Sequence, residues 1–218
     1  MSVTTIVLGE SGSGKTCSLR NFDPAKVALI RVISKPLPFR ATGWVNFVSQ
    51  DSFKIIAAMQ KAVNNGFKII VIDDFQYLMS FEFMRNADKV GFQKFTDIAV
   101  HAFNVIKEAM ALPDDVRVYI LSHIATGDDG VSRIKTIGKL LDEKITIEGM
   151  VTNVLRTEVS NGKYYFRTKN NGSDTVKTAL GLFDDELIEN DLNAVDEQIQ
   201  AFYNLNEEPD PDSPATGA

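Results

Sequence analysis

The fold class is decided by one stretch near the N-terminus, Gly9-Glu10-Ser11-Gly12-Ser13-Gly14-Lys15-Thr16. It fits the pattern G-x-x-x-x-G-K-[ST], in which glycines let backbone N–H groups converge on phosphate oxygens. With glycine at about 7% of residues, such a match arises by chance in only about one chain in a hundred of this length. A β-branched apolar run, residues 4–8, precedes the stretch, and residues 15–20 can form a helix. Strand, tight loop and helix are the context that a phosphate-binding loop requires.

Each residue type in this loop has a predicted task. Lys15 is expected to reach the outer phosphates of a nucleotide and to act in catalysis, and the Thr16 hydroxyl is expected to ligate Mg²⁺. A helix starting near Gly14 would add its positive dipole end. The predicted nucleotide contacts are Gly9, Glu10, Ser11, Gly12, Ser13, Gly14, Lys15, Thr16 and Cys17.

A second signal follows an apolar run at residues 67–72, which ends in Asp73 and Asp74. Such a run is typical of a parallel strand buried on both faces. A phosphate-binding loop needs a carboxylate for the magnesium shell at the C-terminal end of a buried strand, and Asp73 meets this description. We therefore predict ATP and Mg²⁺ as cofactors, with Thr16 and Asp73 as the metal ligands.

The remaining pattern alternates strands and helices, which implies a parallel sheet covered on both faces. Further strands are expected at residues 26–33, 44–48 and 116–123, and helices at residues 52–64, 92–111 and 195–203. Residues 150–159 and 163–168 flank Asn161-Gly162, a strong hairpin signal. We predict one domain over residues 1–206, with a hairpin addition at about residues 150–170.

Composition narrows the class of protein. The chain has 218 residues, 44% of them hydrophobic, and a net charge of -6, which argues against coating nucleic acid by bulk charge. A single cysteine, Cys17, excludes an intramolecular disulfide and a Cys-rich zinc site. No apolar run reaches membrane-spanning length, so we expect a cytoplasmic protein without a membrane partner. Residues 207–218 are acidic and proline-rich, and we expect a disordered tail that aids solubility or occupies a basic site in cis.

Three segments together, Gly-Glu-Ser-Gly-Ser-Gly-Lys-Thr, Val-Ile-Asp-Asp-Phe and Ile-Leu-Ser-His, resemble the small RecA-like or AAA-type nucleotide-binding proteins of bacteriophages. Within these, the chain is similar to recombination ATPases that assist single-strand annealing, over residues 3–177. The resemblance implies an α/β P-loop NTPase with a RecA-like (additional-strand) core and a C-terminal β-hairpin addition. It also implies that the 116–123 strand lies between the P-loop strand and the Asp73 strand.

On this resemblance, Asp74 and His123 become candidate catalytic residues. An acid directly after the magnesium carboxylate can polarise the attacking water, although glutamate is more usual there. Asp74 instead caps the following turn or helix in the alternative interpretation. His123 ends its strand where the γ-phosphate would lie, and it either senses hydrolysis or serves as a structural hydrogen-bonding residue.

The chain departs from RecA at the end of the 26–33 strand, where no acidic residue stands, and no extended basic tract is present. Two basic clusters follow the Asp73 and His123 strands, and they either face DNA or form a solvated surface. They are Arg85, Lys89 and Lys94, and Arg133, Lys135 and Lys139. Because no arginine of the same chain is an obvious partner for the transition state, we expect a neighbouring subunit to supply a cation. The candidates are Arg133, Lys135, Lys139, Arg156, Arg167 and Lys169.

The function expected from these features is Mg-dependent ATP hydrolysis coupled to single-stranded DNA in phage recombination or replication, by a homo-oligomer with ATP between subunits. Two alternatives belong to other classes. One is a small P-loop kinase, against which the chain shows no Arg-rich lid. The other is an ATP-switched interaction module with little turnover, for which aspartate in place of glutamate at Asp74 is the argument.

Overall fold

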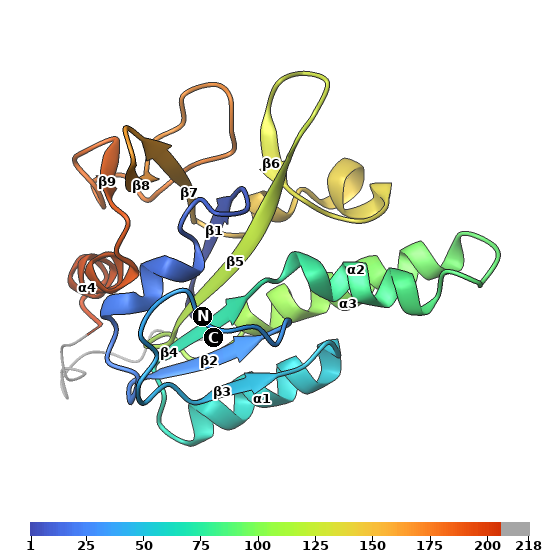
Figure 1. Cartoon of the computed structure of the whole chain (residues 1–218), viewed down its shortest axis with the longest axis horizontal. Coiled ribbons are helices and arrows are strands. Elements are labelled where there is room, and N and C mark those ends of the chain that lie inside the picture. The colour runs from blue at the N-terminus through green and yellow to red at the C-terminus, as the bar shows by residue number, and fades with distance from the viewer. Residues whose placement is uncertain (206–218) are drawn as a thin grey trace, which may run out of the picture.

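The computed structural model describes residues 1–205, so the expected disordered tail lies outside the described residues. Within that range the strands form one nine-stranded, mostly parallel sheet in the order β3-β2-β4-β5-β1-β7-β8-β9, with β6 beside β5 (Figure 1). The parallel strands are β3 (Asn46–Val48), β2 (Val27–Arg31), β4 (Ile69–Asp73), β5 (Arg117–Thr126), β1 (Val3–Gly9) and β7 (Asn153–Ser160). The antiparallel strands are β6 (Ser132–Ile134), β8 (Lys163–Arg167) and β9 (Leu187–Glu189).

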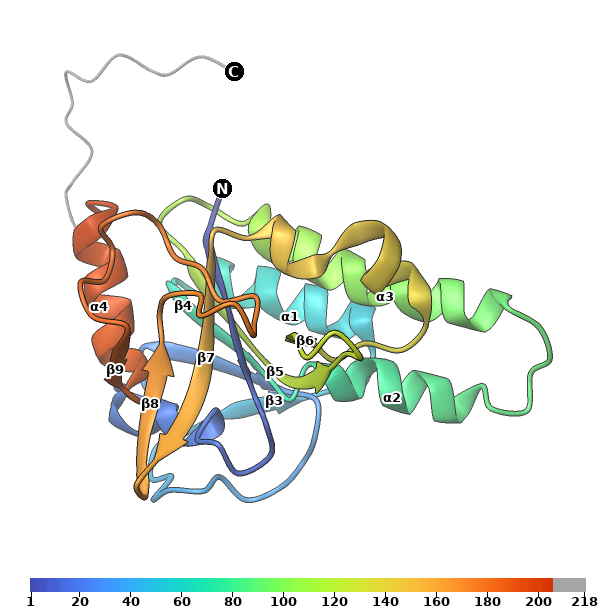
Figure 2. The same ribbon diagram turned by 90° about the horizontal axis from the view of Figure 1, so that it is seen from above.

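Helices cover both faces of the sheet, as the alternating pattern predicts. Figure 2 places α4 on one side of the strands and the longer helices on the other. The face opposite α4 carries α1 (Ser52–Asn64), α2 (Gln76–Arg85), α3 (Gln93–Met110), and the short helices η2 (Leu140–Ile145) and η3 (Ile147–Met150). The face that α4 (Leu192–Phe202) covers also carries η1 (Thr16–Asn21). The predicted α/β class with a largely parallel sheet is confirmed.

Local chemistry explains where several elements begin and turn. The Asp51 carboxylate accepts hydrogen bonds from the backbone N–H groups of Phe53 and Lys54, at 2.9 and 3.2 Å, and so caps α1. Asn161 and Gly162 have φ angles of 52° and 74°, as a two-residue turn between β7 and β8 requires. The expected hairpin is present, and its first strand pairs in parallel with β1, so the hairpin extends the main sheet.

The strand order brings three strand ends together. β5 pairs with β1 on one side and β4 on the other, as expected for the 116–123 strand. In this register Gly9 lies opposite His123, and Asp73 ends β4 two strands away from Gly9. Because the strands are parallel, their carboxyl ends share one edge of the sheet, where loops can build a site.

The expected helix after the glycine-rich loop is present one residue later than predicted, and it is a 3₁₀ helix. η1 is a 3₁₀ helix of six residues, and Phe22 after it is already extended. Asp23-Pro24 explains the end of the helix, because proline lacks an N–H and biases the residue before it away from helical angles. The helix dipole expected at the loop therefore comes from a single short helix, η1.

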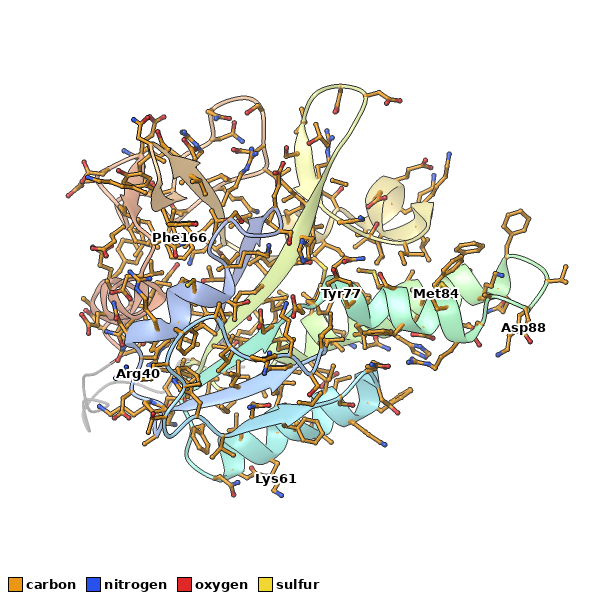
Figure 3. All side chains as sticks on the ribbon, viewed as in Figure 1. Arg40, Lys61, Tyr77, Met84, Asp88 and Phe166 are labelled. Atoms are coloured by element: carbon orange, nitrogen blue, oxygen red, sulfur yellow. The ribbon has the colours of Figure 1, made fainter. Side chains whose placement is uncertain are left out.

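Other elements escaped the sequence analysis. β5 continues to Thr126 and pairs with β6, so His123 lies within the strand instead of at its end, and the two strands form a hairpin. Helix α2 was not predicted, because its apolar residues are spread around it. Together α2 and α3 form an arm that extends away from the sheet, and Tyr77, Met84 and Asp88 lie progressively farther out along it (Figure 3). No helix among residues 1–205 is both long and apolar enough to cross a membrane.

Candidate functional site

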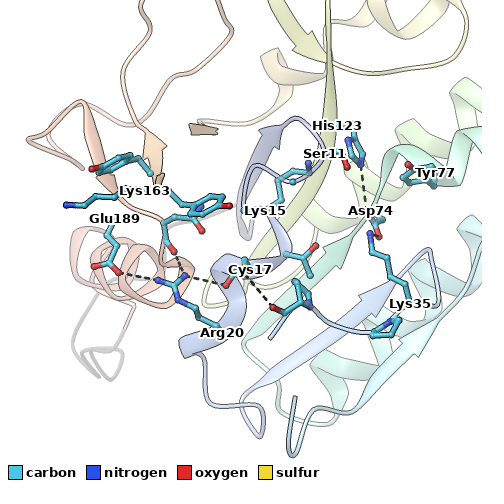
Figure 4. Close-up of a pocket in the computed structure, with 18 residues that line it drawn as sticks. Ser11, Lys15, Cys17, Arg20, Lys35, Asp74, Tyr77, His123, Lys163 and Glu189 are labelled. Carbon is cyan, nitrogen blue, oxygen red and sulfur yellow. Dashed lines mark hydrogen bonds and ion pairs between the residues drawn. The ribbon is translucent and has the colours of Figure 1, made fainter. Parts of the chain in front are cut away.

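A cleft of about 970 Å³ opens at the carboxyl ends of β1 and β4, over the glycine-rich loop. Its two walls come from distant parts of the chain, and both carry charged side chains. One wall holds Lys35, Asp74 and His123, and the other holds Arg20, Lys163 and Glu189 (Figure 4). The cleft floor is the loop that the sequence analysis selected, with Ser11, Gly12, Gly14, Lys15, Thr16 and Cys17 among its lining residues.

Two glycines of the loop are required by its geometry. A Cβ at Gly9 would lie 1.8 Å from Thr157 Oγ1, so no side chain fits there. Gly14 has a φ of 101°, which other residues rarely adopt. The loop is also tied to the sheet, because Ser13 Oγ lies 2.5 Å from Thr157 Oγ1 and donates to the Glu10 carbonyl at 2.7 Å. Strand β7 thus fixes the loop from the side opposite Asp73.

Lys15 is folded over the loop that carries it. Its Nζ donates to the carbonyl oxygens of Gly9 at 2.8 Å and Glu10 at 2.7 Å, and the residue is only 7% exposed. Burial lowers the pKa of Lys15 to about 8, although the carboxylates of Asp74 and Asp73 act in the opposite direction. A cation held by carbonyl oxygens in a poorly solvated site is placed to exchange those weak partners for an anion.

The two predicted metal ligands touch one another. The Thr16 hydroxyl donates to Asp73 at 3.0 Å to Oδ1 and 3.2 Å to Oδ2. Asp73 is fully buried, and burial, together with the charge of Asp74, raises its pKa to about 6. No group of three or more His, Cys, Asp or Glu residues in the described range could hold a metal by itself. One carboxylate and one hydroxyl suit Mg²⁺, which keeps several waters and phosphate oxygens as its other ligands.

The buried Asp73 carboxylate predicts a measurable effect on stability. A carboxyl whose folded pKa is raised from 3.8 to about 6 destabilises the fold above pH 6, and that cost disappears as the pH falls toward 4. Asp73→Asn is therefore expected to raise the free energy of unfolding at pH 7.5 by about 1 to 3 kcal/mol. Urea unfolding between pH 4 and 8 would show the gain shrinking on acidification. A variant less stable than the wild type at pH 7.5 would contradict this assignment.

Asp74 lies in the cleft and is held in an unusual backbone conformation. Its φ is 64°, and it is 2% exposed. Lys35 Nζ approaches Oδ2 at 2.7 Å, and His123 Nε2 lies 3.9 Å from Oδ1 (Figure 4). Burial and the charge of Lys15 lower the pKa of His123, so the ring is neutral at pH 7. The structure brings Asp74 and His123 together beside Lys15, as the sequence analysis expected, and adds Lys35, which it missed.

One buried basic residue near the site was not anticipated from the sequence. Arg31 belongs to the same chain and lies at the end of β2, directly beside Asp73 in the sheet register. Its guanidinium is buried, lowers the pKa of Asp73 and donates to the Lys35 carbonyl. Only an acidic residue was expected to mark a site at the end of the 26–33 strand. Basic residues at the end of β2, Arg31, and shortly after it, Lys35, are the sequence signal for this part of the site, because parallel strands end at one edge.

The second wall was not predicted from the sequence. Arg20 follows the loop in η1, and it donates to the Asn190 carbonyl and pairs with Glu189 at 3.2 Å. Asn190 is 2% exposed, and its Nδ2 has no hydrogen-bond partner among the described residues. Tyr164 from β8 completes this side, while Cys17 contacts the Pro38 carbonyl at 3.9 Å across the floor. The wall has room and polar groups for the nucleoside part of a nucleotide.

The first basic cluster is partly structural. Lys94 donates to the backbone carbonyls of Asn86, Ala87 and Lys89, and it lies over two aromatic rings of the arm. Arg85 donates to Gln50. These bonds close the turn between α2 and α3 and join the arm to the loop before α1.

Apart from Lys135, the candidates for a neighbouring subunit's site form ion pairs or hydrogen bonds within their own chain. Lys135 lies near enough to His123 for its charge to lower the pKa of that ring. The other pairs are Arg133 with Asp129, Lys139 with Glu143, Arg156 with Asp174, Arg167 with Glu158, and Lys169 with the Asp184 carbonyl. A role in a neighbour's site would have to compete with these contacts.

Comparison with known proteins does not assign this chain to a family. No protein-family model matches the chain, and no curated protein matches it. The functional assignment therefore rests on the cleft itself: a glycine-rich loop, a folded-back lysine, a hydroxyl on a buried carboxylate, and a second acid beside a neutral histidine.

Proposed function

We propose that this protein is a RecA-like P-loop NTPase that binds and hydrolyses ATP with Mg²⁺. The observation that carries the proposal is the contact of Thr16 with Asp73, at 3.0 Å. It joins the last residue of the G-x-x-x-x-G-K-T loop to the carboxylate at the end of β4. That hydroxyl and carboxylate are the two protein groups that a P-loop site needs for magnesium.

Each residue of the cleft has a proposed role in binding or hydrolysis. Backbone N–H groups of the loop hold phosphate oxygens, and Lys15 turns from the Gly9 and Glu10 carbonyls to the β and γ phosphates. Thr16 and Asp73 would hold Mg²⁺, which supplies positive charge against the phosphate oxygens during transfer. Asp74 accepts a proton from the water that attacks the γ-phosphorus, and the bond to the ADP oxygen breaks. His123, 3.9 Å from Asp74, orients that carboxylate or the water.

The coupling of ATP hydrolysis to single-stranded DNA and the formation of a homo-oligomer are further parts of the proposal. They rest on the resemblance to phage recombination ATPases, which also favours the cytoplasm of a bacterial host. The β5–β6 hairpin extends from the strand that carries His123, and it includes Arg133, with Lys135 directly after it. DNA bound to these basic residues would lie close to the cleft. ATP bound between subunits would make turnover depend on assembly.

One observation favours a second candidate, the ATP-switched interaction module. Asp74 is already paired with Lys35 at 2.7 Å, and a paired carboxylate is a weaker base. If this pair persists when nucleotide binds, the protein would change its surface on ATP binding and turn over slowly.

Phosphate release measured with and without single-stranded DNA distinguishes these functions. We expect Mg·ATP hydrolysis that rises with single-stranded DNA and, per subunit, with protein concentration, while EDTA abolishes it. Double-stranded DNA and GTP are the matched controls. Binding of ATP without hydrolysis, with or without DNA, would favour the switch. Failure to bind ATP at all would rule out the proposed function.

A further inference from the structure

Lys35 occupies a fixed position on the cleft wall. It follows β2 in a loop that contains Pro36 and Pro38, whose rings restrict the backbone. The guanidinium of Arg31, itself only 4% exposed, donates to the Lys35 carbonyl and anchors the loop from beneath. The backbone that carries this lysine is therefore held in place, while its side chain extends into the cleft toward Asp74 (Figure 4).

The two partners of this ion pair differ in exposure. The Lys35 side chain is 44% exposed, whereas that of Asp74 is 3% exposed. Asp74 Oδ2 accepts no hydrogen bond of good geometry from the described residues, so the lysine is its main compensation. An exposed, flexible cation on a buried anion can leave for a stronger anion without breaking packed structure.

Lys35 also acts on the whole charged centre. Burial is the main cause of the raised pKa of Asp73 and of the lowered pKa values of Lys15 and His123; the charge of Lys35 opposes the first change and adds to the other two. Two lysines thus face two aspartates in one cleft. The terminal phosphate of a nucleoside triphosphate would bring additional negative charge beside Lys15. Lys35, whose side chain is 44% exposed, is the second cation in the cleft that could pair with it.

We propose that Lys35 senses the terminal phosphate of the bound triphosphate, leaving Asp74 for the γ-phosphate oxygens and thereby freeing Asp74 to act on water. This inference rests on the proposed ATP site. With ADP there is no γ-phosphate, so Lys35 stays on Asp74 and the carboxylate remains paired. The cation for the transferring phosphate then comes from the same chain, in contrast to the expectation that only a neighbour could supply it.

The test compares the affinities for a non-hydrolysable β,γ-imido ATP and for ADP, measured by calorimetry with Mg²⁺ and with EDTA. Lys35→Ala is expected to weaken analogue binding by about 10-fold, because a charge-assisted bond to phosphate is lost, and to change ADP affinity by less than about 3-fold. Lys35→Arg should restore most of the analogue affinity. Thermal unfolding of each variant checks that the fold is kept.

Lys68→Ala is the matched control. Lys68 also forms an ion pair with an aspartate, Asp115, and its side chain is 50% exposed, but it precedes β4 at the opposite edge of the sheet. Its removal should leave both affinities unchanged. If Lys35→Ala weakens the binding of the analogue and of ADP equally, or changes neither affinity, Lys35 does not sense the terminal phosphate. In that case a wild-type protein that binds both nucleotides still has a nucleotide site. A wild-type protein that binds neither nucleotide overturns both proposals.

Discussion

Lys15→Ala is expected to weaken ATP binding by at least about 10²-fold and to leave no measurable hydrolysis. The ammonium is held at 2.8 and 2.7 Å by the carbonyls of Gly9 and Glu10, and in the proposed site it exchanges them for phosphate oxygens. Each charge-assisted bond lost is worth about 1.5 to 3 kcal/mol, and two such bonds account for this factor. A fluorescent ATP analogue titrated into each variant measures the binding, and a phosphate-release assay measures turnover.

The same variant should keep its fold without nucleotide. Burial lowers the pKa of Lys15 to about 8, so the buried ammonium costs stability at neutral pH and its removal relieves that cost. Equal melting temperatures, or a small gain for Lys15→Ala, would separate loss of binding from unfolding. Lys68→Ala again serves as the control for removing a lysine. ATP hydrolysis unchanged in Lys15→Ala would rule out the P-loop assignment.

The central part of the site could be predicted because its signals are local in the sequence. The glycine-rich loop lies within eight consecutive residues, and Asp73 directly ends an apolar run. Parallel pairing then places those two points at one edge, since every parallel strand ends on the same side. Only the order of the strands needed the resemblance to RecA-like proteins, and β5 does lie between β1 and β4.

Apart from Asp74 and His123, the walls of the cleft could not be predicted in this way. Tyr164 and Asn190 reach the loop only because β7 pairs with β1, and β8 and β9 follow it across the sheet. Nothing local in those residues indicates a cleft. Lys35 was missed for another reason: a lone lysine after a strand is usually solvent-facing, and its pairing with Asp74 depends on where the loop anchored by Arg31 leads.

Asp74→Asn is expected to slow ATP hydrolysis by about 10²-fold or more, the usual scale of general-base removal, while ATP affinity stays within a few fold. The substitution suits the site because the residue has a φ of 64°, and asparagine tolerates this left-handed region better than other non-glycine residues. The amide keeps the size of the carboxyl group but accepts no proton from water. Single-turnover hydrolysis with saturating ATP separates this step from binding.

Asp73→Asn provides the matched comparison, because Asp73 ends β4, Asp74 follows it directly, and both substitutions change a carboxylate to an amide. Asp73 contacts Thr16, so its variant should lose the effect of Mg²⁺ on ATP affinity, whereas Asp74→Asn should retain it. Since Lys35 loses its partner in Asp74→Asn, that variant should also bind the triphosphate no less tightly than the wild type. If binding instead collapses in Asp74→Asn and Asp73→Asn spares it, the roles of the two acids are reversed, and the water must be activated from the Thr16 side of the cleft.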